Sequence, residues 1–221
     1  MLLELPKFLA QSEVADIASR FDKAVFEDGR QTAAGAARHV KANKQVARHW
    51  PGLQHFEAVI NSALTRSRLL AERLSPSACS ATIFAEYHPG DCYGPHIDAV
   101  FAGQPPIRHD LSVTLFLNEP DDYEGGELRL HLPGGDFQDI KLQSGSAIAY
   151  PTTLVHEVLP VRSGIRRVAV FWIQSFYRDA EIRQIVADLR TTLNHLRSQS
   201  EVDSLPLACA LANLERKFIG S

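Results

Sequence analysis

The chain has 221 residues, of which 45% are hydrophobic and 22% are charged, a composition typical of a soluble globular protein with a sizeable core. Its net charge of -3 favours neither a nucleic-acid partner nor a membrane partner. The three cysteines have no paired spacing, and residues 1–7 lack the features of a signal peptide, so we expect a cytoplasmic protein without disulfides.

Residues 1–77 are predicted to form a mainly helical segment that packs on the core formed by the rest of the chain. Ser12 is a candidate N-cap for a first helix, and a second helix is predicted after Pro51. Residues 30–48, between these helices, are small, polar and basic. They are one candidate for a rim around a substrate site, and the loop 99–109 is another. The apolar positions of the first helix follow helical spacing: Val14, Ile17, Ala18, Phe21 and Val25.

Residues 78–178 are predicted to form a β domain. Short apolar or alternating runs recur between turn signals, as in 111–117 and 128–132. The turn signal at 162–164 separates two further runs, which predicts a hairpin. Many short strands with frequent turns favour an antiparallel sandwich or barrel, so the predicted fold is mainly β with flanking helices.

Residues 179–221 are predicted to be helical again, with a second short helix near 205–218. The first of these helices carries an apolar stripe at helical spacing: Ile182, Ile185, Val186, Leu189, Leu193 and Leu196. Such a stripe needs to be buried, either against the β domain or in a contact between subunits. The sequence is therefore compatible with a homo-oligomer formed through the helical flanks.

Two histidines and one acid offer a metal-binding set. In an extended strand, residues two apart point to the same face, so His96 and Asp98 would present their side chains together. His156, from a distant strand, would complete a two-histidine, one-carboxylate face with open positions, which suits non-haem Fe(II) and dioxygen chemistry. Arg166 is a candidate clamp for a carboxylate co-substrate. Arg167 is predicted to face the other side of the same strand.

The motifs around these residues resemble the PKHD-type hydroxylases of the PiuC and YbiX group. These belong to the Fe(II)- and 2-oxoglutarate-dependent dioxygenases of the prolyl 4-hydroxylase type. The matching motifs are Tyr87-x-x-Gly90-x-x-Tyr93-x-x-His96-x-Asp98, then Tyr123-Glu124-Gly125-Gly126-Glu127-Leu128, then His156-x-Val158-x-Pro160-Val161-x-x-Gly164-x-Arg166. The resemblance covers most of the chain. It implies a double-stranded β-helix, or jelly roll, with N-terminal and C-terminal helical segments.

The resemblance also implies the chemistry. His96, Asp98 and His156 would hold Fe(II), and 2-oxoglutarate and dioxygen would be co-substrates, with succinate and CO2 released and L-ascorbate as an optional reductant. Arg166 would bind the distal carboxylate of 2-oxoglutarate. Tyr87 and Thr114 are weaker candidates for contacts with 2-oxoglutarate; a core tyrosine and an ordinary strand threonine are the alternatives.

Two positions qualify this assignment. An intact Asp98 favours hydroxylation, because related halogenating enzymes have a small residue there. Some relatives have a tyrosine near Phe116 that helps to hold the distal carboxylate, and phenylalanine has no hydroxyl. The second partner of the carboxylate, besides Arg166, is therefore left open.

The substrate also stays open, as a small molecule or a peptide. Membership of the PiuC and YbiX group would link it to bacterial iron uptake, for example as a siderophore. Two other functions remain: a non-catalytic jelly-roll module that binds a ligand or senses iron, and a zinc hydrolase, which leaves Arg166 without a role. Trp172 is interpreted as a core residue. His88, His109 and His131 are interpreted as lying outside the metal site.

Overall fold

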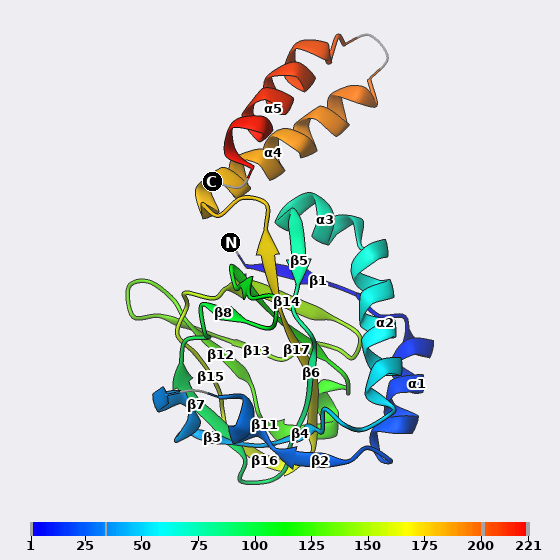
Figure 1. The fold of residues 1–221 in the computed structure, drawn as a ribbon, viewed down its shortest axis with the longest axis vertical. Coiled ribbons are helices and arrows are strands. Elements are labelled where there is room, and N and C mark those ends of the chain that lie inside the picture. Colours follow the sequence, from blue (N-terminus) through cyan, green and yellow to red (C-terminus); the bar gives the residue numbers. More distant parts are fainter. Residues whose placement is uncertain (1, 34, 200–201, 220–221) are drawn as a thin grey trace.

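Two antiparallel sheets form the centre of the structure, a computed structural model that describes residues 2–33, 35–199 and 202–219 (Figure 1). The larger sheet has the strand order β1-β14-β10-β17-β6-β4-β2, with β5 paired to β17, and the smaller has the order β13-β12-β15-β7-β3. One cluster of buried apolar side chains draws residues from both sheets, so the sheets enclose a shared core. This is the mainly β architecture that the sequence predicts.

The strands are short, as the frequent turn signals indicate. The larger sheet contains β1 (Leu3–Leu5), β2 (Phe26–Asp28), β4 (Lys44–Val46), β5 (Pro76–Cys79), β6 (Ile83–Tyr87), β10 (Leu111–Phe116), β14 (Ala147–Pro151) and β17 (Arg166–Ser175). The smaller sheet contains β3 (Lys41–Ala42), β7 (Cys92–His96), β12 (Leu128–His131), β13 (Phe137–Ile140) and β15 (His156–Val158). Two further pairs are β8 (Phe101–Ala102) with β9 (Ile107–Arg108), and β11 (Tyr123–Gly125) with β16 (Val161–Gly164).

The helices lie in two groups. α1 (Gln11–Phe21), α2 (Leu53–Arg66) and α3 (Arg68–Leu74) pack beside the larger sheet, on the right in Figure 1. Aromatic rings join them to the sheet: the ring centroids of Phe21 and Phe56 are 5.9 Å apart, and those of Phe56 and Phe84 are 4.9 Å apart. The outer face of the larger sheet is therefore buried by the N-terminal helices.

The N-terminal region differs from its prediction in two ways. It contains four short strands as well as helices, and β1 to β4 extend both sheets at their edges. Ser12 does not cap α1, because the helix begins at Gln11 and the Glu13 carboxylate accepts a hydrogen bond from the Ala10 backbone N–H at 2.8 Å. Val25 lies beyond the end of α1 and is exposed.

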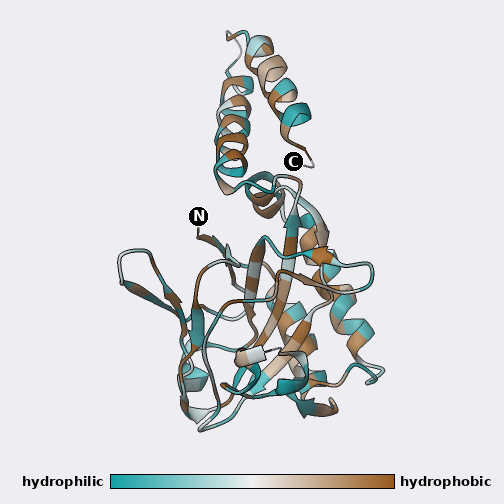
Figure 2. Cartoon of the chain, turned by 60° about the vertical axis from the view of Figure 1, so that its left-hand side comes forward, coloured by the Kyte–Doolittle hydropathy of each residue, from teal (hydrophilic) through white to brown (hydrophobic). Residues whose placement is uncertain are grey.

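The C-terminal helices are present where the sequence predicts them. α4 (Ala180–Arg197) and α5 (Leu205–Phe218) form a hairpin that extends away from the sheets, with apolar residues along both helices (Figures 1 and 2). The hairpin has its own small core, which includes Val186, Leu193 and Leu211. No helix in the described part of the chain is long and apolar enough to cross a membrane.

Strand register decides which side chains of the larger sheet reach the space between the sheets. Ser112 on β10 lies opposite Tyr150 on β14 and Trp172 on β17. Arg166, at the start of β17, lies opposite Tyr87 on β6. Alternate residues of a strand share a face, so these five side chains line the same inner face.

The smaller sheet supplies the opposite wall. His96 on β7 pairs directly with His156 on β15. Tyr93, also on β7, lies opposite Val158 on one side and Lys41 of β3 on the other. The two histidines of the proposed metal set therefore come together through strand pairing.

Candidate metal centre

His96, Asp98 and His156 lie together as the sequence predicts. One ligand atom from each residue can be chosen so that all three lie within 4.8 Å of one another. His96 Nε2 is 3.8 Å from Asp98 Oδ1, and His156 Nε2 is 3.6 Å from Asp98 Oδ2. Among the described residues, this is the group of histidine, cysteine and acidic side chains that meets such a spacing. These distances suit three ligands around one ion.

Backbone carbonyls orient both imidazoles. Nδ1 of His96 donates to the Gly94 carbonyl at 2.8 Å, and Nδ1 of His156 donates to the Leu154 carbonyl at 3.0 Å. With the proton on Nδ1, each Nε2 has a free lone pair for a metal. Burial, together with the neighbouring His156, lowers the pKa of His96, so its ring stays neutral as metal binding requires.

Asp98 is held from the opposite sheet by two donors. The Ser112 hydroxyl and the Trp172 indole N–H both donate to Asp98 Oδ2, at 2.7 and 2.9 Å. The two donors are cross-strand partners on β10 and β17, so the sheet itself fixes their spacing. The interpretation of Trp172 as a core residue was therefore wrong: it is partly exposed and positions a candidate metal ligand. The sequence analysis did not single out Ser112.

We expect the variants Ser112→Ala and Trp172→Phe to weaken metal binding about 10- to 100-fold each, the usual effect of removing a hydrogen bond to a ligating group. The measurement is a Mn(II) titration of each purified variant, followed by electron paramagnetic resonance of the free ion. Ser163→Ala, on the exposed strand β16, is the matched control. Unchanged affinity in both variants would mean that Asp98 is oriented by other groups.

Arg166 lines the same cavity as the three candidate ligands. It is 1% exposed, and its Cζ lies 5.0 Å from the Tyr87 ring centroid and 5.6 Å from that of Phe116. Within the described residues, its Nε and Nη1 have no hydrogen-bond partner, and no ion pair includes it. A buried cation without an acid is costly, so this guanidinium is suited to an anion from outside the chain. Arg167 faces away, as predicted, and pairs with Asp22 at 2.6 Å.

Three buried hydroxyl groups line the same cavity as the metal ligands and Arg166. Tyr87, Thr114 and Tyr150 line a cavity of about 610 Å³, including the solvent at its mouth. Burial raises the pKa of Tyr87 to about 12, and burial with nearby Asp98 raises that of Tyr150 further, so both are neutral hydrogen-bonding groups. Tyr150, whose ring centroid is 5.1 Å from that of His156, is a site residue that the sequence analysis missed.

A second cavity of about 1000 Å³, open solvent included, adjoins the first. It shares Tyr93, Asp98 and Trp172 with the inner cavity. Its walls include residues from both segments named as rim candidates, 30–48 and 99–109. We call these the inner and outer cavities. The outer cavity therefore borders the metal ligands at Asp98.

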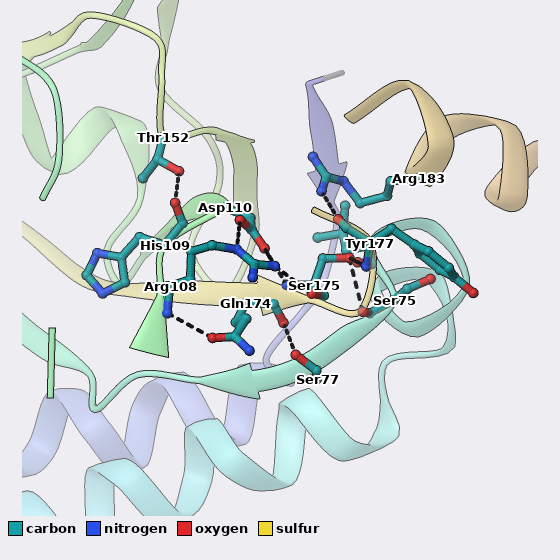
Figure 3. A network of polar contacts seen from close by, with 11 residues as sticks. Ser75, Ser77, Arg108, His109, Asp110, Thr152, Gln174, Ser175, Tyr177 and Arg183 are labelled. Atoms are coloured by element: carbon teal, nitrogen blue, oxygen red, sulfur yellow. Dashed lines mark hydrogen bonds and ion pairs between the residues drawn. The ribbon is translucent and has the colours of Figure 1, made fainter. Parts of the chain in front are cut away.

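Hydrogen bonds fix the β8–β9 hairpin at its base beside this outer cavity (Figure 3). Arg108 donates to the Asp110 carboxylate at 2.7 and 2.9 Å, and Thr152 donates to the His109 carbonyl at 2.6 Å. The His109 ring stacks on Trp172 with centroids 4.7 Å apart. The hairpin base therefore supports the residue that holds Asp98.

The three other histidines considered as ligands lie outside the metal cluster, as predicted. His88 contacts Glu86 at 2.7 Å, and His131 contacts Glu157 at 3.0 Å. His109 forms the stacked pair with Trp172. None of the three belongs to the described group of potential ligands.

Comparison with known proteins agrees with this geometry. The 2OG-Fe(II) oxygenase superfamily model matches residues 82–174, which contain the three candidate ligands and Arg166. A PKHD-type hydroxylase of Picosynechococcus sp. is 42% identical over 202 residues, covering 90% of both chains. The chain belongs to the PKHD-type hydroxylases. The resemblance inferred from the motifs is thereby confirmed, and the protein is a 2-oxoglutarate-dependent hydroxylase that uses Fe(II).

Solved structures share the fold of this hydroxylase. An oxidoreductase of the 2OG-Fe(II) oxygenase family from Burkholderia pseudomallei has a TM-score of 0.59 at 20% identity, covering 80% of this chain and 85% of that one. A prolyl hydroxylase from Trichoplax adhaerens, in complex with a hypoxia inducible factor peptide fragment, has a TM-score of 0.57 at 16% identity. It covers 84% of this chain and 86% of that chain. The predicted jelly roll is therefore confirmed.

Proposed function

We propose that the hydroxylase holds Fe(II) with His96, Asp98 and His156, binds 2-oxoglutarate between that ion and Arg166, and hydroxylates a substrate that enters through the outer cavity. The observation that carries this proposal is the buried Arg166, which shares a cavity with the three ligands and forms no ion pair with a described carboxylate. A site that bound only a metal ion would not require the buried guanidinium of Arg166 as well.

The donor set fits Fe(II). Two imidazoles and one carboxylate would hold Fe(II) while leaving it accessible to 2-oxoglutarate and dioxygen. A zinc hydrolase at the same residues would not explain why Arg166 is buried with its Nε and Nη1 unsatisfied among the described residues. The intact carboxylate at Asp98 favours hydroxylation over halogenation.

The rest of the inner cavity fits 2-oxoglutarate. The guanidinium of Arg166 can donate two parallel hydrogen bonds to a carboxylate. Tyr87 and Thr114 supply neutral hydroxyls, while the ring of Phe116 packs against the Arg166 guanidinium, 5.6 Å from its Cζ. Apolar walls from Leu128, Val158 and Val170 suit the methylene groups of the co-substrate and exclude water: these residues line the same cavity.

The contribution of the chain to the reaction is positioning. When bound, Fe(II) and 2-oxoglutarate supply the oxidising chemistry, with release of succinate and CO2. Ser112 and Trp172 keep the Asp98 carboxylate in a fixed orientation. The backbone carbonyls that accept from His96 and His156 keep both Nε2 atoms unprotonated. The walls of the outer cavity hold the substrate C–H bond near this centre.

The test is a turnover assay with purified protein, Fe(II), 2-oxoglutarate and a mixture of metabolites or peptides. We expect succinate that depends on both Fe(II) and dioxygen, and a product heavier by one oxygen atom. L-ascorbate is expected to prolong turnover, and siderophores belong in the mixture because of the proposed link to iron uptake. Binding of 2-oxoglutarate without succinate would favour a non-catalytic module. Zinc-dependent ester or peptide hydrolysis without 2-oxoglutarate would favour a hydrolase.

A further inference from the structure

A second buried cation, Lys41, enters the inner cavity from the smaller sheet. It lies on β3 opposite Tyr93 of β7, and 8% of its surface is exposed. Its Nζ donates to the Thr32 hydroxyl at 3.0 Å and lies 4.9 Å from the centroid of the Tyr93 ring. Lysine is rarely buried to this extent unless it is paired. Burying this ammonium therefore costs desolvation free energy, which a purely structural role does not explain.

Lys41 has no carboxylate partner within the part of the chain that the structure describes. Asp28 is paired with Arg30, and Asp98 accepts from Ser112 and Trp172. An ammonium has three N–H donors, and the hydrogen bonds found among described residues engage one of them. Burial lowers its pKa to about 8, which leaves the group largely charged near neutral pH. Lys41 is thus a cation with free donors facing a cavity.

The hydrogen bonds around Lys41 hold it at the boundary of the two cavities. The Thr32 oxygen that accepts from Lys41 also lies 2.9 Å from Gln45 Oε1, so the three side chains form a connected network. Thr32 and Tyr93 line both cavities, whereas Lys41 and Gln45 line the inner one. A group that reaches inward from the outer cavity therefore meets the ammonium beside the metal ligands.

The outer cavity is largely apolar, and its own cation is already engaged. Arg48 lies 3.6 Å from Glu57 in an ion pair. The remaining walls are mainly apolar or aromatic, including Ile83, Tyr93, Ile97, Ile107 and Trp172. Such walls favour an apolar body and leave Lys41 as the unpaired charge for an anionic group to meet.

We propose that Lys41 recognises a carboxylate on the primary substrate, whose apolar body lies in the outer cavity. This inference rests on the proposed function and assigns a substrate class to the same site. The two carboxylates of 2-oxoglutarate are assigned to the metal and to Arg166, so the ammonium of Lys41 is left for the substrate. Thr32 and Gln45 keep that ammonium in place, and Lys41 determines specificity through its charge.

The test uses the complex of the protein with Mn(II) and 2-oxoglutarate, and benzoate as the probe of an apolar carboxylate. Bound Mn(II) accelerates the relaxation of nearby protons, so proton relaxation reports entry of the probe. We expect saturable relaxation of benzoate, and much weaker binding of the neutral analogue benzamide. The variant Lys41→Met is expected to weaken benzoate binding about 10- to 100-fold, the usual value of a hydrogen bond to a charged group.

Two variants provide the controls. Lys44→Met makes the same chemical change on the neighbouring strand β4, where the side chain is exposed, and is expected to bind benzoate like the wild type. Lys41→Arg keeps the charge and is expected to retain most of the affinity. The affinity of Lys41→Met for 2-oxoglutarate is expected to stay within about 2-fold of the wild type, since a twofold change is less than the value of one hydrogen bond.

Three results would overturn the assignment: no preference for benzoate over benzamide in the wild type, unchanged benzoate binding in Lys41→Met, or loss of 2-oxoglutarate binding in that variant. The last result would place Lys41 in the co-substrate site instead. Binding of 2-oxoglutarate to the Mn(II) protein is measured first, before benzoate is added. A wild-type protein that binds no 2-oxoglutarate with Mn(II) would refute the proposed function itself, which separates the two failures.

Discussion

Replacing Asp98 with alanine is expected to abolish succinate formation and to weaken Mn(II) or Fe(II) binding by more than about 100-fold, since loss of a supporting hydrogen bond alone costs 10- to 100-fold. The variant removes the anionic ligand and leaves two neutral imidazoles to bind a divalent ion. It also leaves the donors of Ser112 and Trp172 without their shared acceptor. Anaerobic metal titration measures the first effect, and chromatography of succinate measures the second.

Asp136→Ala is a suitable control for this experiment, because Asp136 lies in an exposed turn between β12 and β13. Circular dichroism of both variants checks that the fold is intact. If Asp98→Ala bound the metal as tightly as the wild type, Asp98 would not be a metal ligand, and the proposed ligand set would be wrong.

Replacing Arg166 with methionine is expected to raise the dissociation constant of 2-oxoglutarate by at least about 30-fold, because truncating a buried charged partner costs roughly 2 kcal/mol or more. The side chain is enclosed between the rings of Tyr87 and Phe116, so methionine can fill much of its volume. Calorimetry with the Mn(II) protein gives the affinity. Metal binding in the absence of 2-oxoglutarate is expected to stay unchanged.

The matched control is Arg167→Met, one residue along β17, where the side chain pairs with Asp22 on the outer surface. A keto acid without the distal carboxylate, 2-oxobutyrate, provides a second comparison. Its affinity is expected to be nearly the same in the wild type and in Arg166→Met. If Arg166→Met lost equal affinity for 2-oxoglutarate and for 2-oxobutyrate, Arg166 would act on the keto acid group or on the fold, and not on the distal carboxylate.

The central part of the candidate site could be predicted from sequence because its signals are local. His96 and Asp98 were expected to share a face by strand alternation, but β7 ends at His96 and Asp98 lies just beyond it; the two side chains still reach the same site. His156 and Arg166 lie within ordered motifs of the same domain. The resemblance implied by these motifs includes a jelly roll, whose paired strands bring the four residues into one cavity. The direction of Arg167 was predicted correctly for the same reason, since neighbours in a strand face opposite sides.

The residues that were missed depend on contacts across strands. Ser112 and Trp172 are far apart in sequence and meet at Asp98 only through the register of β10 and β17. Tyr150 reaches the cavity through its pairing with Ser112. Such register is a property of the assembled sheet, so neither composition nor spacing within one strand could reveal these roles.

The strands of the N-terminal region were missed for a different reason. β1 to β4 have two or three residues each, too few to show the alternation that identifies a strand. They are strands because the edges of two larger sheets offer backbone partners, as when β4 pairs with β6. Lys41, which enters the cavity from one of these strands, could therefore be recognised from sequence as basic but not as buried.

Strand β17 connects two parts of the candidate site. It carries Arg166 at its beginning and Trp172, which holds Asp98, six residues later, and it is hydrogen-bonded to β10 on one side and β6 on the other. Paired on both sides, this stretch of backbone cannot lengthen or shorten to suit a ligand. Under the proposed function, we therefore expect 2-oxoglutarate to bind more tightly than oxaloacetate, which has one methylene group fewer, or 2-oxoadipate, which has one more, because the backbone fixes the separation of Asp98 and the guanidinium of Arg166.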